Sequence, residues 1–282
     1  MSAFLHALGQ YPFLQHALLG GLLASVGCGV VGSYVVVRRI GFLAGGVAHS
    51  VLGGMGAALY YGGDPLLGAL AAAVLAALAI GLVARYWREQ VDTLIAAIWA
   101  VGMAVGILFI SRTPGYDTEL MSYLFGNILM VTPGELWLMA ALDGVLLGIV
   151  ALYYKALLAV IFDEEFATLR NLPVTALFLL LLLMVALTVV LLIQVVGLIL
   201  VIALLTLPAA IAGHYTHTLR HMMLGATALG MLFTSSGLAL SYGPDLPSGA
   251  TIIVVAGLAY LASALISRAL RQWRARRVAV ER

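Results

Sequence analysis

Two polar residues, His49 and Asp143, stand within long apolar stretches of the sequence, and their side chains can bind a metal ion or relay a proton. If these stretches cross a membrane, a charged carboxylate at the centre costs roughly 2.5–3.5 kcal/mol on insertion scales, so it usually has a function. A hydrogen bond to a neighbouring helix is the structural alternative for each residue. Both are therefore candidate metal ligands, and the structural role stays open.

The sequence around His49 is poor in side-chain volume. Gly41, Gly45, Gly53 and Ala57 recur with the histidine at every fourth position, and a second row of small residues follows one position later. Small residues at this spacing allow two helices to approach closely in lipid. We therefore expect a partner helix to pack against this face, within reach of the imidazole.

Three further histidines, His214, His217 and His221, lie close together, and the last two are one helical turn apart. Imidazoles at this spacing can share a metal ion. The three residues also lie between two apolar runs and beside Arg220, which is typical of a solvated loop. We interpret them as loop residues, with a metal site at the inner membrane face as the alternative.

The densest run of charge is IFDEEFATLRNLP at residues 161–173. Acidic residues at its start, a basic residue near its end and the following Asn-Leu-Pro are the charge order and stop signals of a helix. The run is predicted to form a two-turn amphipathic helix on a membrane face. Periodicity alone favours an ordinary solvated loop.

Composition defines the elements that must position these residues. Of the 282 residues, 63% are hydrophobic and 9% charged, whereas soluble domains carry about 25% charged residues. Apolar runs near the ~20 residues that span a membrane recur along the chain, and in lipid each has to be a helix. We predict an all-α, polytopic transmembrane bundle that forms one domain over residues 1–282. Nine spans are expected, with eight or ten as alternatives, near residues 16–37, 42–61, 65–84, 92–111, 135–154, 174–193, 196–213, 222–242 and 249–267.

The basic residues set the orientation of this bundle. With the N-terminus outside and the C-terminus in the cytoplasm, every arginine and lysine except Arg112 lies on the cytoplasmic side, as the positive-inside rule requires. Residues 161–173 then lie in the cytoplasm. The arginines near the C-terminus are expected to contact anionic lipid.

The sequence lacks the motifs of the commonest hydrolytic enzymes. A phosphate-binding loop needs Gly-x-x-x-x-Gly-Lys followed by Ser or Thr, but the only lysine, Lys155, follows Leu-Tyr-Tyr. His-Glu-x-x-His and Gly-x-Ser-x-Gly are also absent. We expect no catalytic activity, no resident cofactor and no nucleic acid partner.

The segment DEEFATLRNLPV resembles the coupling segment in membrane subunits of ATP-binding-cassette importers, where Glu-x-Ala-x-x-x-Gly-[Leu/Val] docks into a separate ATPase. Glu165, Ala167, Asn171 and Leu172 fall on that pattern. Asn171 replaces the glycine, and both residue types accept the left-handed conformation that ends a helix. The resemblance implies that a cytoplasmic ATPase contacts Asp163, Glu164, Glu165, Ala167, Arg170, Asn171 and Leu172.

Four blocks extend the resemblance over nearly the whole chain: GSYVVVRRIGFLAGGVAHSVLGG (32–54), LMSYLFGNILMVTPGELW (120–137), VVGLILVIALLTLPAAIA (195–212) and DLPSGATIIV (245–254). In order and spacing they resemble the permease family that imports zinc, manganese or iron(II). The resemblance implies a homodimer in the bacterial inner membrane, a cytoplasmic ATP-binding subunit and an external metal-binding protein. It also implies a fold related to the vitamin B12 and siderophore importers.

The same resemblance assigns roles to individual residues. It implies that His49 is a ligand in the metal path. The outer segment before residue 132 is predicted to form a short re-entrant or interfacial helix, in which Tyr123, Phe125 and Asn127 are candidate residues of an outer gate. The family often has an aspartate four residues before the histidine, where Gly45 stands here. With one nitrogen and no adjacent carboxylate, the site would bind its ion weakly, and the sequence does not name the metal.

We therefore expect the membrane subunit of an ATP-driven importer of zinc, manganese or iron. The alternative is a stand-alone secondary transporter or channel in which His49 and Asp143 relay protons. Such transporters usually contain internal repeats with broken helices in corresponding halves, and the sequence shows no convincing repeat.

Overall fold

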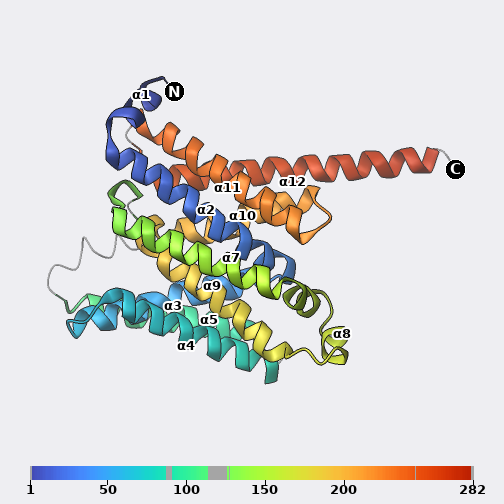
Figure 1. The fold of residues 1–282 in the computed structure, drawn as a ribbon, viewed down its shortest axis with the longest axis horizontal. Helices are drawn as coiled ribbons and strands as arrows, with labels where there is room; N and C mark the ends of the chain where they lie inside the picture. Colours follow the sequence, from blue (N-terminus) through green and yellow to red (C-terminus); the bar gives the residue numbers. More distant parts are fainter. Residues whose placement is uncertain (1, 87–90, 114–125, 127, 245, 281–282) are drawn as a thin grey trace.

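The computed structural model describes residues 2–86, 91–113, 126, 128–244 and 246–280, and every regular element in these residues is helical. Figure 1 shows the nine long helices: α2 (Pro12–Arg38), α3 (Gly41–Tyr60), α4 (Pro65–Tyr86), α5 (Val91–Ile110), α7 (Pro133–Phe162), α9 (Val174–Val196), α10 (Leu198–Tyr215), α11 (Leu219–Tyr242) and α12 (Ser248–Val280). The shorter elements are α1 (Ser2–Gln10), the 3-10 helix η2 (Ile128–Met130) and α8 (Glu164–Leu169). The expected all-α fold is confirmed.

The nine long helices coincide with the nine expected spans. In the described part of the chain, eight of them are long and apolar enough to cross a membrane. The remaining one, α9, contains 23 residues and an apolar stretch over Val174–Val190. The chain is therefore a multi-pass membrane protein.

Two helices run past their expected ends. α7 begins at a capping box in which the Thr132 side chain accepts a hydrogen bond from the backbone N–H of Glu135. It then continues to Phe162, eight residues beyond the predicted end at 154, because no helix-breaking residue interrupts it. α12 continues past its apolar part, Ser248–Ala269, to Val280, and Figure 1 shows this extension projecting from the bundle.

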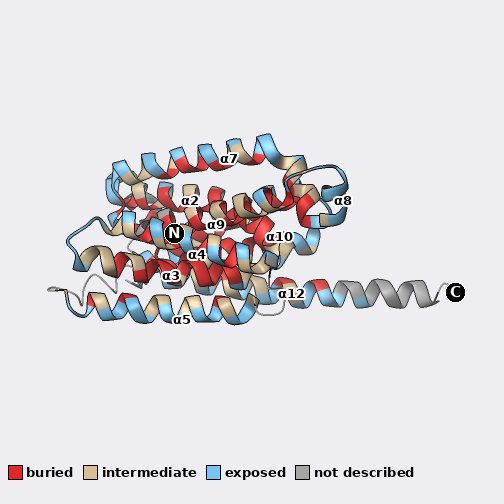
Figure 2. Cartoon of the chain, turned by 90° about the horizontal axis from the view of Figure 1, so that it is seen from below, coloured by how far each residue is buried: buried red, intermediate tan, exposed pale blue. Residues whose placement is uncertain are grey.

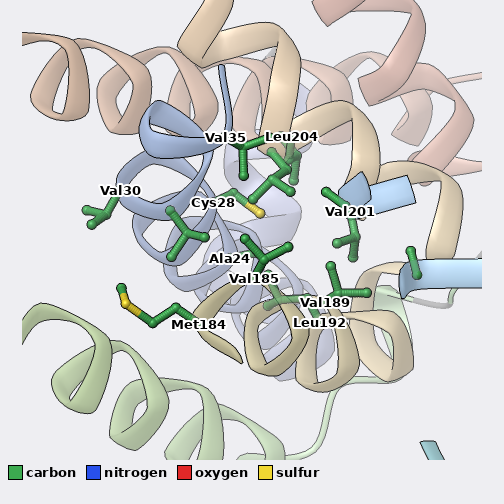
Figure 3. Packing of buried hydrophobic residues seen from close by; sticks show 14 of the residues in the cluster. Ala24, Cys28, Val30, Val35, Met184, Val185, Val189, Leu192, Val201 and Leu204 are labelled. Carbon is green, nitrogen blue, oxygen red and sulfur yellow. The ribbon is translucent and has the colours of Figure 1, made fainter. Parts of the chain in front are cut away.

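The long helices form two groups that α9 joins. In one group α2 packs against α7, α10 and α11, and in the other α3 packs against α4 and α5. α9 contacts members of both groups. Figure 2 shows buried residues concentrated on α2, α9 and α10, whereas α5 and α7 expose their outer faces. Figure 3 shows Ala24 and Cys28 of α2 packed with Val185 of α9 and Leu204 of α10 in this apolar centre.

The small-residue face of α3 packs against α5. A Cβ atom at Gly53 would lie 2.9 Å from the carbonyl oxygen of Gly102, and one at Gly56 would lie 2.6 Å from that of Gly106. A side chain at either position of α3 would therefore force the helices apart, since these backbones are in direct contact. The close partner helix expected from the spacing around His49 is α5, whereas Gly54 in the second row of small residues meets Gly68 of α4.

Candidate functional site

The imidazole of His49 lies between α3 and α5 and stacks on the indole of Trp99. The ring centroids are 4.1 Å apart and the ring planes differ by 13°. The Nδ1 atom is buried and has no hydrogen-bond partner among the described residues. A neutral imidazole whose ring nitrogen is not used in a hydrogen bond can offer that nitrogen to a metal ion. Helix α3 therefore positions one candidate metal ligand.

Gly45, one helical turn before His49, faces the same indole. A Cβ atom at Gly45 would lie 3.1 Å from the Cζ3 atom of Trp99, so a larger side chain would have to displace the ring. Trp99 thus fills the space in which a carboxylate at position 45 would stand. The sequence analysis did not identify Trp99 as a neighbour of His49. The only sign of its role in the sequence is that it is the one tryptophan of the largely apolar span α5.

Asp143 of α7 is buried against α2. Its side chain is 8% exposed, and a Cβ atom added to Gly27 would lie 2.8 Å from its Oδ1 atom. The Oδ2 atom is buried and has no hydrogen-bond partner among the residues that the structure describes. An unpaired carboxylate oxygen at this depth is costly. The geometry fits a protonated structural carboxyl group and a cation ligand equally well, so both alternatives stand.

The structure does not bring His49 and Asp143 together. His49 lies in the interface of α3 with α5, Asp143 lies in the interface of α7 with α2, and α3 and α7 do not pack closely on each other. Within the described ranges, no group of three His, Cys, Asp or Glu side chains could hold a metal ion. Among the described residues, neither His49 nor Asp143 therefore has two further His, Cys, Asp or Glu side chains with which to share an ion.

The three histidines near residue 217 have separate surroundings. His214 belongs to the last turn of α10, and its Nδ1 lies 3.0 Å from the Oγ of Ser263 on α12. His221 belongs to the first turn of α11, where its Nδ1 lies 2.6 Å from the Oγ1 of the N-cap residue Thr218. His217 is exposed in the connection and, with His214, lines a cavity of about 370 Å³. The interpretation as loop residues is correct for His217 and wrong for the other two, because α10 continues to Tyr215 and α11 already begins at Leu219.

Helix α8 has well-defined caps at both ends. The Oδ1 of Asp163 accepts a hydrogen bond from the backbone N–H of Phe166 at 2.9 Å. At the other end Asn171 has a φ of 55°, and the N–H of Leu172 donates to the carbonyl oxygen of Ala167 at 3.0 Å, as in a Schellman motif. The predicted short helix is confirmed, and Asn171 has the left-handed conformation expected of the glycine that it replaces.

The two faces of α8 differ in exposure. Ala167 is buried against the bundle, whereas the side chains of Phe166 and Leu169 are 46% and 83% exposed. Glu165 is exposed as well, and the guanidinium of Arg170 lies 5.0 Å from the centroid of the Phe166 ring. The outer face of α8 therefore presents apolar surface next to charge, which is typical of a docking surface.

Glu164 turns toward the bundle instead. Its carboxylate forms ion pairs with Arg38 at the end of α2 and with Arg85 at the end of α4, the latter at 3.5 Å. Arg38 also donates to the carbonyl oxygen of Ile161 at 3.3 Å and lies 5.8 Å from the ring centroid of Phe178. The two arginines, Glu164 and Phe178 line a groove of about 550 Å³ beside α8. Sequence reasoning used the two arginines for orientation alone, since pairing between residues this far apart has no local signal.

The three expected gate residues, Tyr123, Phe125 and Asn127, lie outside the described residues, as does most of the predicted re-entrant segment. Gly126 is described, and its φ is 68°. A Cβ atom there would collide with the backbone of Val196 and Gly197, where α9 ends and α10 begins. Gly126 therefore contacts the junction between these two spans.

Three comparisons with known proteins find relatives that cover nearly the whole chain. The family model described as the ABC 3 transport family matches residues 10–267. An uncharacterised membrane protein of Synechocystis sp. is 51% identical over 259 residues, which is 92% of either chain. The manganese transport system membrane protein MntC of Halalkalibacterium halodurans is 33% identical over 98% of this chain and 96% of its own. The solved structure of PsaBC from Streptococcus pneumoniae in complex with Fab aligns with a TM-score of 0.83 and 28% identity, over 93% of this chain and 94% of that chain.

Proposed function

We infer the function of this chain from the family to which it belongs, the ABC 3 transport family. The chain is the membrane-spanning subunit of an ATP-driven importer of divalent metal ions. This conclusion is supported by the similarity to MntC of Halalkalibacterium halodurans, which belongs to a manganese transport system. The fold shared with PsaBC over most of both chains supports it further. Zinc, manganese and iron(II) are the candidate ions.

ATP hydrolysis belongs to a separate subunit, because this chain has no phosphate-binding loop. The observation that carries the proposal is the outer face of α8, where Phe166 and Leu169 are exposed on a capped helix beside charged residues. This face lies at the end of the bundle that carries Arg38 and Arg85, which the positive-inside rule assigns to the cytoplasm. We propose that the ATP-binding subunit docks here.

The remaining partners follow from the same proposal. A second copy of the chain completes the membrane unit, and an external metal-binding protein delivers the ion to the opposite face. Nucleotide-driven closure of the ATPases displaces α8 and switches the bundle from outside-open to inside-open. The ion is cargo, and its transfer requires only ligand exchange and two alternative packings of the helices.

The ion path passes His49 in this proposal. Its Nδ1 has no partner among the described residues, and the backbones of α3 and α5 pack tightly on either side of it. The further ligands come from water or from the second copy. A site with so few protein nitrogens binds weakly, which suits a path that must also release its ion.

The test is metal uptake by His49→Ala in vesicles that contain the permease, the ATP-binding subunit and the external protein. Uptake of manganese, zinc and iron(II) is measured separately. ATP-dependent uptake of the transported ion should fall at least tenfold, while the ATP-binding subunit still co-purifies. The matched control is His217→Ala, which removes an exposed imidazole and should transport normally.

Two outcomes contradict the proposal. Near-normal uptake by His49→Ala removes this residue from the ion path. Uptake that a proton gradient drives in vesicles without the ATP-binding subunit identifies a secondary transporter instead.

A further inference from the structure

Glu164 differs from the two acidic residues beside it. Asp163 uses its carboxylate to cap α8, and Glu165 is exposed. Glu164 is half-buried, and among the described residues it forms the ion pairs that join α8 to two separate helices. Arg38 is held in place by its additional contacts with Ile161 and Phe178, so this side of the link has a defined geometry. A residue with this arrangement is poorly placed to contact another protein.

The two arginines belong to different groups of helices. Arg38 ends α2, which packs with α7, α10 and α11, whereas Arg85 lies in the last turn of α4. α4 packs against α3 through a backbone contact in which a Cβ atom on Gly54 would overlap the carbonyl oxygen of Gly68. α3 in turn carries His49. The path from Glu164 to the imidazole therefore runs along most of α4, ~26 Å from Arg85 to Gly68 at about 1.5 Å per residue, and crosses to α3 at Gly54.

We propose that Glu164 is a positioning residue that transmits the movement of α8 to both groups of helices, and that it is not part of the docking surface. This inference rests on the proposed function. When the ATPase displaces α8, the Glu164–Arg38 pair moves the end of α2, and the Glu164–Arg85 pair moves the end of α4 together with α3. The docking residues on the outer face and the transmitting residue on the inner face are then distinct.

The electrostatics explain why a single carboxylate is suited to this role. Both ion pairs lie in a groove that separates α8 from the spans, and each side chain is only partly exposed. Removal of the negative charge leaves two guanidinium groups near one uncharged side chain and abolishes the ion-pair attraction of α8 to both spans. The helix remains capped by Asp163 and Asn171, so α8 itself stays folded.

The experiment compares Glu164→Gln, Arg85→Gln and the double variant in the reconstituted importer. Three quantities are measured: the Kd for the ATP-binding subunit, the rate of ATP hydrolysis, and the number of ions transported per ATP. Each single variant should bind the subunit within threefold of the wild type and should still hydrolyse ATP. The number of ions per ATP should fall at least fivefold, and the double variant should be no worse than the more impaired single variant.

Two controls make the result specific. Arg39→Gln removes the neighbouring positive charge, which forms no ion pair within the described residues, and should leave ions per ATP near the wild-type value. Glu164→Asp keeps the charge on a shorter side chain and should transport more ions per ATP than Glu164→Gln, though fewer than the wild type. It also serves as the test variant if thermal melting shows that Glu164→Gln does not fold.

Each remaining outcome overturns one specific claim. A tenfold or larger loss of affinity for the ATP-binding subunit in Glu164→Gln shows that Glu164 belongs to the docking surface. An unchanged number of ions per ATP in Arg85→Gln refutes the link to α4. Absence of ATP-dependent uptake by the wild-type complex refutes the proposed function itself, whichever way the variants behave.

Discussion

Leu169→Ala tests how much of the outer face of α8 the ATP-binding subunit covers. The Leu169 side chain is 83% exposed in the free chain, and the substitution removes the three carbon atoms beyond Cβ. Burial contributes about 0.8 kcal/mol per methylene, so complete coverage of the exposed part predicts a loss of ~2 kcal/mol in binding free energy. A dissociation constant changes tenfold for every 1.4 kcal/mol, and the subunit should therefore bind about thirtyfold more weakly.

The assay is a titration of the purified ATP-binding subunit onto the permease in lipid nanodiscs. Because the side chain makes few contacts in the free chain, the free energy of unfolding should change by less than ~0.5 kcal/mol. The matched control is Leu152→Ala on α7, a leucine that is 76% exposed but lies about 15 Å before the end of the helix at Phe162, out of reach of a cytoplasmic protein. A change below threefold for Leu169→Ala, or an equal loss for both variants, would refute the docking role of α8.

The remaining predictions concern the end of α8 and the buried carboxylate. Asn171 has a φ of 55°, where a β-branched side chain costs about 1–2 kcal/mol; Asn171→Val should therefore lower the melting temperature and ATP-dependent uptake, whereas Asn171→Gly should preserve both. Equal melting temperatures for the two variants would contradict this reasoning. Asp143→Asn keeps an oxygen facing Gly27 and should fold normally. If Asp143 is a metal ligand, ATP-dependent uptake by this variant should fall at least tenfold. Wild-type uptake by this variant would assign Asp143 a structural role only.

The sequence was sufficient to predict the elements whose signals are local. Each long helix coincides with an apolar run, because a membrane span has to be both apolar and helical. α8 was predicted from the acidic residues at its start and the Asn-Leu-Pro at its end, and the structure has both caps. The close approach of α5 to α3 was predicted from glycine spacing alone, although the identity of the partner helix was not.

The interactions between distant segments could not be predicted in the same way. Glu164 is 126 positions from Arg38, so only the packed bundle brings the two together. Trp99 reaches His49 because α5 lies along the glycine face of α3, which depends on the arrangement of all the spans. The true ends of α7 and α12 were missed because both helices continue past the length that a membrane span needs, α7 to Phe162 and α12 to Val280. The separation of His49 from Asp143 also follows from the packing and has no signal in either residue's neighbours.

The glycine contacts between α3 and α5 restrict how the region around His49 can rearrange. Ordinary helix pairs slide past each other by small steps because the side chains between them change rotamer. Gly53 and Gly102 are in direct backbone contact, so no side chain lies between the helices there. The two helices therefore either move together as one rigid body or separate completely. An intermediate, half-open passage beside the imidazole has no packing to sustain it, so access to the ion should switch in an all-or-none manner.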